Sequence, residues 1–371
     1  MYHRIVAHNR LGEPLAELHK AWAVSRAVAL NKGGVLTFNM SVEDTKCTEA
    51  NLDYNNLIGV YSDEFEPWWG YVVEHSQTGG QMAITCHHIL HRLGRRLTRP
   101  GKMENVTAGA IFRFLLGEAN REESCGINLG EVFDGGKVYT MEFEYESIYD
   151  KIQDLLEMSG CYLQMETIRP GLWELSLVEK VGRDLTDTVV FYRGIDFDGK
   201  PEMRGDNTQF ANRVFALGQH EESSDETERP IGEYTDWNSV QDEGLSELPI
   251  EVSDVSDRHT LDVLARAEVN KRLKAYYTIP ITLNRKRELW SKFTDGDIVC
   301  VYLPGYMFKG AVLPMRILGR EPNEAKGIMV VAAEVVRGEQ AQLLSMYKNS
   351  HYGTRLGDLP ELPKDENPPT E

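Results

Sequence analysis

Residues 68–86 read WWGYVVEHSQTGGQMAITC, two β-rich runs separated by the glycine pair Gly79-Gly80. Aromatic and β-branched residues favour strands, and adjacent glycines supply the positive φ angles of a tight turn. The stretch therefore predicts a β-hairpin with strands over 68–74 and 81–86. The basic run that follows, His88-Ile89-Leu90-His91-Arg92-Leu93, predicts a short helix that ends before Arg99-Pro100-Gly101, because proline disfavours helix in the residue before it.

The rest of the first hundred residues has the same β character. Residues 21–30 and 35–42 flank Asn31-Lys32-Gly33-Gly34, which predicts a second hairpin. Residues 2–8 form a further short, apolar-rich run. We therefore expect a mainly β fold in this part of the chain.

Residues 101–185 change to a helical period. Asn105 is the expected N-cap of a helix whose apolar face carries Ala110, Ile111, Phe114 and Leu115. A second helix is predicted from the capping-box pattern of Ser147 and Asp150 to a stop at Gly160. Its inward side chains are Ile148, Ile152, Leu155 and Leu156, and a hairpin over 162–168 and 172–179 follows. This part predicts a small α+β insert between β-rich regions.

The last third returns to strand patterns around one helix. Strands are predicted over 189–192, 212–218, 278–283, 298–303, 308–318 and 328–336. Asp257 is the expected N-cap of a helix carrying Leu261, Leu264, Ala265, Val269 and Leu273 at helical spacing. We expect Leu261, Leu264, Ala265 and Val269 to be largely buried.

Two segments predict little fixed structure. Residues 221–257 hold thirteen Asp and Glu against one basic residue, Arg229, and such a run favours a solvated loop. Residues 357–371 are rich in proline and poor in apolar side chains, which favours an extended, flexible tail.

Charge and composition exclude several classes of protein. The 371 residues carry a formal charge of −18, so binding to nucleic-acid phosphates or anionic lipid is not expected. The longest apolar run, 328–333, is far too short to span a membrane. Five scattered cysteines (Cys47, Cys86, Cys125, Cys161 and Cys300) indicate reduced thiols.

Motifs that carry chemistry are weak. His87 and His91 share a helical spacing and are candidate zinc ligands, although ordinary packing explains them as well. Asp196-Phe197-Asp198-Gly199 resembles part of a calcium loop, but a β-turn explains it better. Trp68 and Trp69, with Tyr61, are candidates for a sugar-stacking platform beside acidic residues, which leaves open a carbohydrate-active or receptor-binding protein. We assign no catalytic, cofactor-binding or metal-binding residue.

The order of these parts resembles the distal tail and baseplate hub proteins of tailed phages. The resemblance rests on the Trp68-Trp69-Gly70 hairpin, the helix 88–93, the α+β insert, the strand Asn212-Arg213-Val214, the acidic segment, the helix 261–273 and the strand 296–301. It covers roughly residues 1–340. Related hub proteins occur in gene transfer agents and phage-like injection machines.

The resemblance implies a trimeric, pseudo-hexameric ring. Each subunit would contribute two tail-tube-like β-barrel domains, one from 1–100 with 186–220 and one from 221–340. Residues 101–185 would form the insert domain, and residues 341–371 a flexible C-terminal tail. The fold class predicted is thus mainly β with α+β inserts. Within the ring, we expect the apolar part of the acidic segment, 245–252, to dock on a neighbouring subunit.

The resemblance also implies the setting of the protein. It would be a virion component at the tail tip, assembled in the bacterial host cytoplasm. Its partners would be a hexameric distal tail or tube protein above, tip fibre or cell-contacting proteins below, and the tape measure protein. Genomic DNA would pass through without specific binding. Relatives often carry a C-terminal hydrolase or fibre module, which we do not expect in a chain ending at Glu371. No enzymatic activity and no cofactor are therefore expected.

Overall fold

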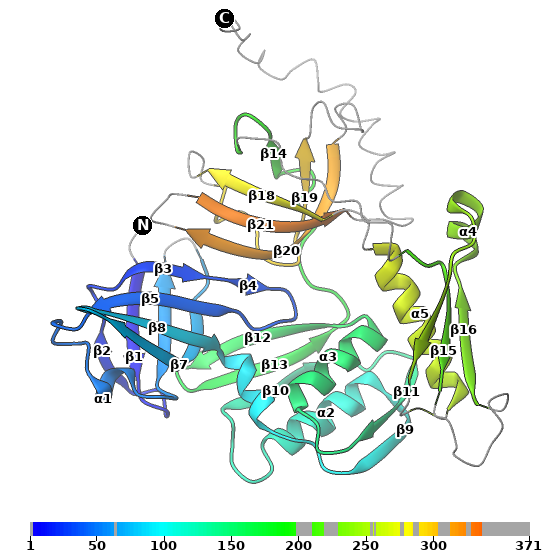
Figure 1. The fold of residues 1–371 in the computed structure, drawn as a ribbon, viewed down its shortest axis with the longest axis horizontal. Coiled ribbons are helices and arrows are strands. Elements are labelled where there is room, and N and C mark those ends of the chain that lie inside the picture. Colours follow the sequence, from blue (N-terminus) through cyan, green and yellow to red (C-terminus); the bar gives the residue numbers. More distant parts are fainter. Residues whose placement is uncertain are drawn as a thin grey trace, which may run out of the picture.

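A computed structural model gives the fold, which is mainly β with several helices (Figure 1). The structure describes residues 3–62, 65–197, 210–218, 229–252, 255, 257–274, 278–284, 289–302, 312–323 and 328–335. The predicted tail 357–371 lies outside the described residues. Four groups of strands and helices, each around its own apolar cluster, make up this part of the chain.

The first group contains the predicted hairpins. Its strands run in the order β3-β5-β8-β7-β6-β1-β2, and Thr78 pairs with Gln81 at the turn of the hairpin 68–86. Alternate side chains of β5, Leu36, Phe38 and Met40, point into the core. The elements are β1 (His3–His8), β2 (Pro14–Glu17), β3 (Trp22–Arg26), β4 (Val28–Ala29), β5 (Val35–Ser41), α1 (Glu49–Leu52), β6 (Leu57–Ser62), β7 (Trp68–Thr78) and β8 (Gln81–His88). Both predicted hairpins are confirmed.

The second group contains the elements of residues 101–185, for which an α+β insert is expected, together with the 3-10 helix that precedes them. It comprises the 3-10 helix η1 (Ile89–Arg95), β9 (Gly101–Thr107), α2 (Ala108–Ala119), β10 (Ile127–Val132), β11 (Val138–Phe143), α3 (Ile148–Ser159), β12 (Tyr162–Arg169) and β13 (Leu172–Val178). Helix α3 forms as predicted: the Ser147 side chain accepts from the Asp150 N–H, and Gly160 ends the helix with a φ of 71°. All four predicted inward residues are buried.

The predicted cap of α2 was wrong. Thr107, two residues after Asn105, caps the helix by accepting from the Ala110 N–H at 3.2 Å. Asn105 lies within β9 with a φ of 52°. The buried face of the helix includes Ile111 and Leu115 as predicted, and also Phe112 and Leu116.

The third group is a sheet of β14 (Val190–Tyr192), β18 (Thr278–Asn284), β19 (Ile298–Tyr302), β20 (Val312–Asn323) and β21 (Ile328–Val335). Strand β20 also pairs with β3 and β4, so this sheet is continuous with the first group. At the crossing, a Cβ on Gly319 would lie 2.5 Å from the Val28 carbonyl oxygen, so only glycine fits there.

The assignment of 186–220 to the first barrel does not match the strand pairing. Strand β14 pairs in parallel with β19 of the third group, Val190 opposite Cys300. Strand β15 (Arg213–Leu217) belongs to a separate sheet with β16 (Ile231–Thr235) and β17 (Glu247–Glu251). Phe191 is fully buried in the third core, which holds β14 there.

The fourth group corrects the prediction of a loose acidic segment for residues 231–251, whereas residues 221–228 of that segment lie outside the described residues. Residues 231–251 form β16, the helix α4 (Trp237–Glu243) and β17. The predicted docking segment 245–252 packs within its own chain, because β17 pairs in parallel with β15 and places Leu248 and Ile250 in the fourth core. Partly buried and exposed side chains alternate along β17, and this pattern favours a strand although the acidic composition favours a loop.

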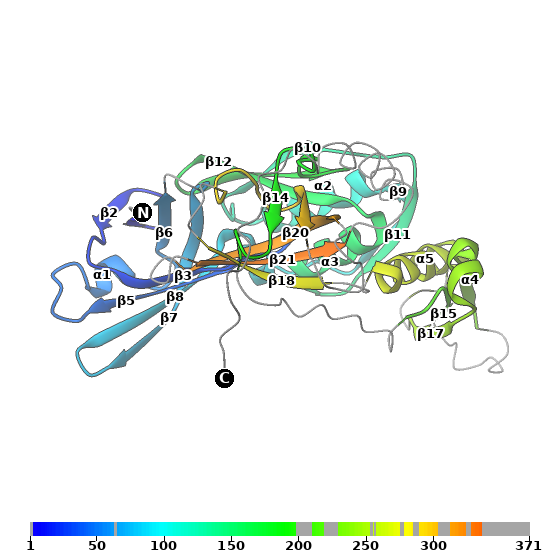
Figure 2. The ribbon, with the colours of Figure 1, turned by 90° about the horizontal axis from the view of Figure 1, so that it is seen from above.

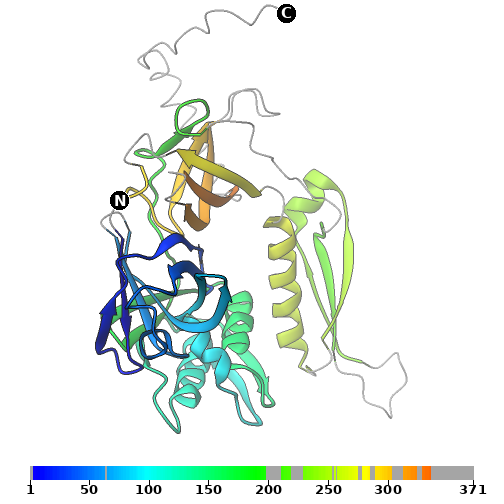
Figure 3. The same ribbon diagram turned by 60° about the vertical axis from the view of Figure 1, so that its left-hand side comes forward.

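Helix α5 (Arg258–Lys274) covers one face of this small sheet. Leu261, Ala265 and Val269 are fully buried as predicted, whereas Leu264 is half-buried. In Figure 3, α5 lies between the sheet and the rest of the molecule, and seen from above in Figure 2 this group forms one end of the molecule.

Closed barrels are not seen among the described strands. The main path of pairing runs from β14 to β2 without returning on itself, and β18 ends a side branch through β21. The two barrel-like groups are therefore open along the described strands, joined through β20.

Candidate functional site: an arginine–aspartate junction

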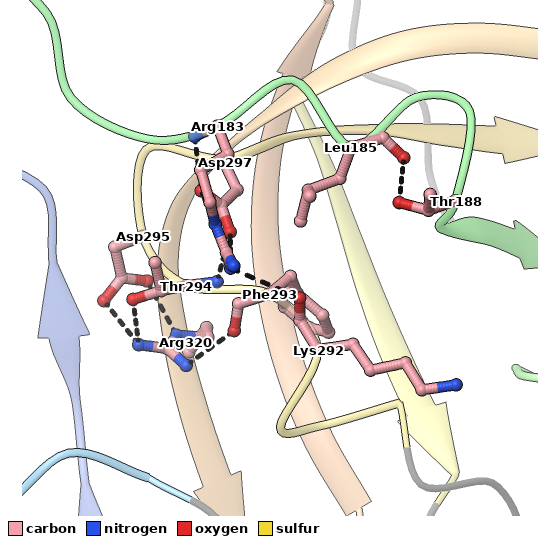
Figure 4. Close-up of polar contacts among 9 residues, drawn as sticks. All are labelled: Arg183, Leu185, Thr188, Lys292, Phe293, Thr294, Asp295, Asp297 and Arg320. Atoms are coloured by element: carbon pink, nitrogen blue, oxygen red, sulfur yellow. Dashed lines mark hydrogen bonds and ion pairs between the residues drawn. The ribbon is translucent and has the colours of Figure 1, made fainter.

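Three of these groups meet at a cluster of arginine and aspartate side chains. Arg183 follows β13 of the insert, Arg26 ends β3, and Asp295 and Asp297 form the turn before β19. Figure 4 shows Arg183 and Arg320 on either side of the turn 293–297. The cluster thus connects the first sheet, the insert and the third sheet.

Asp297 is the buried centre of the cluster. Its side chain has no exposed surface and accepts hydrogen bonds from the Arg183 backbone N–H at 2.6 Å, the Arg183 Nη2 at 2.8 Å and the Thr294 N–H at 2.9 Å. Buried charges need such donors, because an ionised carboxylate without partners is costly to bury. The Asp297 carboxylate therefore fixes the loop from the insert against the turn before β19.

A second ion pair lies beside the first. Arg320 Nε and Nη2 donate to Asp295 Oδ1 and Oδ2 at 3.0 and 3.2 Å, and the same guanidinium donates to the Phe293 carbonyl. Burial raises the pKa of Asp295, and the charges of Arg320 and Arg26 oppose that rise. The Phe65 ring lies near both guanidinium groups, 4.4 Å from Arg26 and 5.6 Å from Arg320.

A cavity of about 810 Å³ opens beside the cluster. Its lining comes from all three groups: Arg26 and Trp68 from the first sheet, Met165 and Arg183 from the insert and its exit, and Asp295 from the third sheet. The arrangement has charged and apolar parts but holds no nucleophile aligned with a general base in the described contacts. Its ion pairs and hydrogen bonds instead hold the three groups in a fixed relative position.

The predicted sugar platform was wrong. Trp68 and Trp69 are 4% and 3% exposed and belong to two apolar clusters. Trp69 packs against Trp173 and Tyr61, with ring centroids 6.0 and 5.7 Å apart. Indoles enclosed in this way cannot stack on a sugar ring.

The histidine pair does lie together. The His87 and His91 rings are 5.2 Å apart, and His91 also packs on Tyr149. Across the described part of the chain, no group of three or more His, Cys, Asp or Glu is placed to hold a metal ion. The pair is thus part of an aromatic stack between β8, η1 and α3.

The described half of the calcium-loop fragment, Asp196 and Phe197, closes a turn that begins at Tyr192. The Asp196 side chain accepts from the Tyr192 N–H at 2.8 Å, and the Gly194 N–H donates to the Phe197 carbonyl. Asp196 is buried, and Asp198 and Gly199 lie outside the described residues. The carboxylate oxygen that bonds the backbone is engaged in holding the turn.

The contacts of the arginine–aspartate junction were not predicted from the sequence. Asp295-Gly296-Asp297 is recognisable as a turn, but nothing in the sequence pairs it with Arg183 or Arg26. The available signal was two carboxylates in a turn between apolar strands, where burial demands basic partners.

Comparison with known proteins shows which solved structures share this architecture. The sequence matches no protein-family model and no curated protein significantly. A prophage tail protein from Listeria monocytogenes superposes with a TM-score of 0.61 at 14% identity, over 95% of this chain and 99% of that one. The chain has the fold of a phage tail protein.

Two further structures agree. The 43 kDa tail protein of a Shewanella oneidensis prophage matches with a TM-score of 0.64 at 14% identity, over 90% of this chain and 98% of that one. A component of the E. coli type VI secretion system, itself similar in structure to bacteriophage T4 tail proteins, matches with a TM-score of 0.50 at 9% identity, over 86% and 74%. Sequences this distant share the fold, and the matches span nearly the whole tail proteins. No helix in the described residues is long and apolar enough to cross a membrane.

Proposed function

We propose that this chain is a structural virion protein, a trimeric hub at the distal end of a phage tail. The observation that carries the proposal is the match over nearly the full length of two prophage tail proteins. Two barrel-like groups in one subunit also suit a ring in which three subunits present six similar units to a hexameric tube. A structural role without enzymatic activity is consistent with the tail-protein neighbours.

The two tube-like units are proposed to be residues 1–100 and the strands of the third group. Residues 101–185 form the insert domain, and 210–274 form a fourth unit. The arginine–aspartate junction holds the insert against the second tube-like unit, which fixes the shape that a subunit presents to its neighbours.

In this proposal the hub contacts a distal tail or tube protein above and tip fibre or cell-contacting proteins below, and reaches the tape measure protein. Genomic DNA passes through the ring at the virion tail tip. A charge of −18 suits a conduit that must not retain DNA, because carboxylates repel phosphates within about 8–10 Å at physiological salt.

The oligomeric state tests the proposal directly. Light scattering on the purified chain should give the mass of three 42.1 kDa subunits, and electron microscopy should show a ring with threefold symmetry. A monomer at all concentrations would contradict the trimeric hub while leaving the tail-protein fold intact.

The channel role needs its own measurement. Replacing the acidic residues of 221–228 by Asn and Gln in an assembled phage, with the ion-paired Glu233, Glu247 and Glu251 left in place, should slow DNA ejection, since neutral walls no longer repel phosphate. Unchanged ejection rates at low and moderate salt would rule out channel lining by this segment.

A further inference from the structure

A patch of arginines stands out on this acidic chain. It lies where the turn 9–12, residues 92–99 and residues 121–126 meet, and we call it the arginine patch: Arg10, Arg95, Arg96 and Arg99. Arg10 and Arg96 share Glu123, with contacts of 3.1 and 3.9 Å, and Arg99 contacts Glu122 at 2.8 Å. Arg95 donates to Asn55 Oδ1 and lies 4.6 Å from the Tyr71 ring, so the three remaining arginines face two carboxylates and leave a small excess of positive charge.

Large apolar side chains are exposed within the same surface. Leu97 is 55% exposed and pairs across a β-bridge with Ser147. Tyr145, two residues before Ser147 and flanked by Glu144 and Glu146, is 66% exposed. Exposed Tyr and Arg together are typical of the residues that contribute most to protein–protein binding. The patch therefore has the composition of an interface.

A second surface has a small net negative charge: Glu233 and Glu247 both pair with Arg213, at 3.0 and 3.1 Å, and Glu251 pairs with Arg229 at 3.1 Å, so three carboxylates face two guanidinium groups. On β15–β17, the face away from α5 is formed by Arg213, Phe215 and Leu217 of the central strand, flanked by Glu233 and Ile231 on one side and by Glu247 and Glu251 on the other. Ile231 is exposed, and Trp237 at the start of α4 is 62% exposed, 5.5 Å from the Arg213 guanidinium. We call this the outer sheet face.

The two surfaces cannot meet within one chain. Helix η1 packs on α3 and β7, α3 contacts α5, and α5 covers the inner face of the sheet. Figure 3 shows the sheet beyond α5, facing away from the remainder of the molecule. Helices α3 and α5 thus stand between the arginine patch and the outer sheet face.

We infer that the arginine patch of one subunit binds the outer sheet face of the next copy of this chain. A cyclic trimer is built from heterologous contacts, in which two different surfaces must be complementary. Here one surface offers exposed Arg and Tyr, and the other offers Glu residues around Phe, Ile and Trp. The inference rests on the proposed trimer and assigns its contact surfaces.

Charge reversal on both sides tests the pairing. Arg96→Glu/Arg99→Glu should weaken trimer association by about tenfold or more, since like charges would then face each other. Glu247→Arg/Glu251→Arg also removes the ion pairs that these glutamates form with Arg213 and Arg229 within the chain. It should weaken the trimer from the outer sheet face, and the four changes together should restore it. The matched control is Lys20→Glu/Lys46→Glu, the same charge change at exposed lysines outside the patch. Light scattering gives the mass, and circular dichroism melting shows that each variant folds.

The outcomes are separable. A wild-type monomer overturns the trimer and this interface with it. A wild-type trimer whose two reversed variants remain trimeric overturns the interface alone. If the arginine variant misfolds, Trp237→Ala and the Glu247/Glu251 reversal test the interface from the other side. These residues belong to the fourth group, which does not carry the arginine patch. Wild-type binding to duplex DNA that the folded, still trimeric arginine variant loses would assign the patch to nucleic acid instead and overturn the inference.

Discussion

Asp297 and Arg183 lie 114 positions apart in the sequence and form an ion pair in which the carboxylate is wholly enclosed while the guanidinium reaches solvent. The pairing is asymmetric, because Asp297 also accepts from two backbone N–H groups. Most of the stabilisation therefore depends on the carboxylate rather than on the arginine side chain.

This asymmetry predicts unequal effects of substitution. Asp297→Ala removes a buried acceptor that serves two backbone N–H groups and an arginine, and should lower the free energy of unfolding by about 2–4 kcal/mol. Arg183→Ala leaves the backbone donors in place and should cost clearly less. Urea unfolding measures both, and equal losses would contradict the asymmetric role.

His88 should make the free energy of unfolding depend on pH. Burial, with the neighbouring His91 charge, lowers the pKa of His88 to about 3. The unfolded chain, with an ordinary pKa near 6.5, then binds the proton more readily, so stability is lost as the pH falls from about 6.5 towards 3.

His88→Asn keeps an acceptor for the Leu90 N–H, which His88 Nδ1 bonds at 3.3 Å. The stability advantage of the wild type over this variant should shrink between pH 7.5 and pH 5. Urea unfolding at the two pH values gives the difference, and an advantage that grows in acid would refute a neutral His88.

Helix α5 offers a comparison of two leucines one turn apart. Leu261→Ala deletes a fully buried side chain in the fourth core and should cost about 2–5 kcal/mol. Leu264→Ala, at a half-buried position, is the matched control and should cost less. Denaturant unfolding ranks the two, and the reverse order would mean that α5 packs by a different face.

Local signals made parts of the fold predictable. Helix α3 could be predicted from cap to stop because Ser147, its apolar positions and Gly160 all act within the helix. The hairpin 68–86 was predictable for the same reason. Asn105 and Thr107 are both acceptable caps, and only the packing of α2 decides between them.

Non-local pairing could not be predicted. Strand β14 joins β19 because Phe191 fills a distant core, and 245–252 folds onto β15 although its composition suggests a loop. The junction depends on Arg26, Arg183 and Asp297, which belong to three separate stretches of sequence. Charge composition says how acidic the chain is, but not which carboxylate becomes buried.

Strand β20 has a mechanical consequence. Its backbone is paired both with β19 and β21 and with β3 and β4, Gly319 opposite Ala29 and Asn323 opposite Ser25. A force that separates the two large sheets therefore acts on the backbone hydrogen bonds of a shared strand and not only on a flexible linker. Force applied to one sheet would thus be passed to the other through the three described residue pairs that join β20 to β3 and β4.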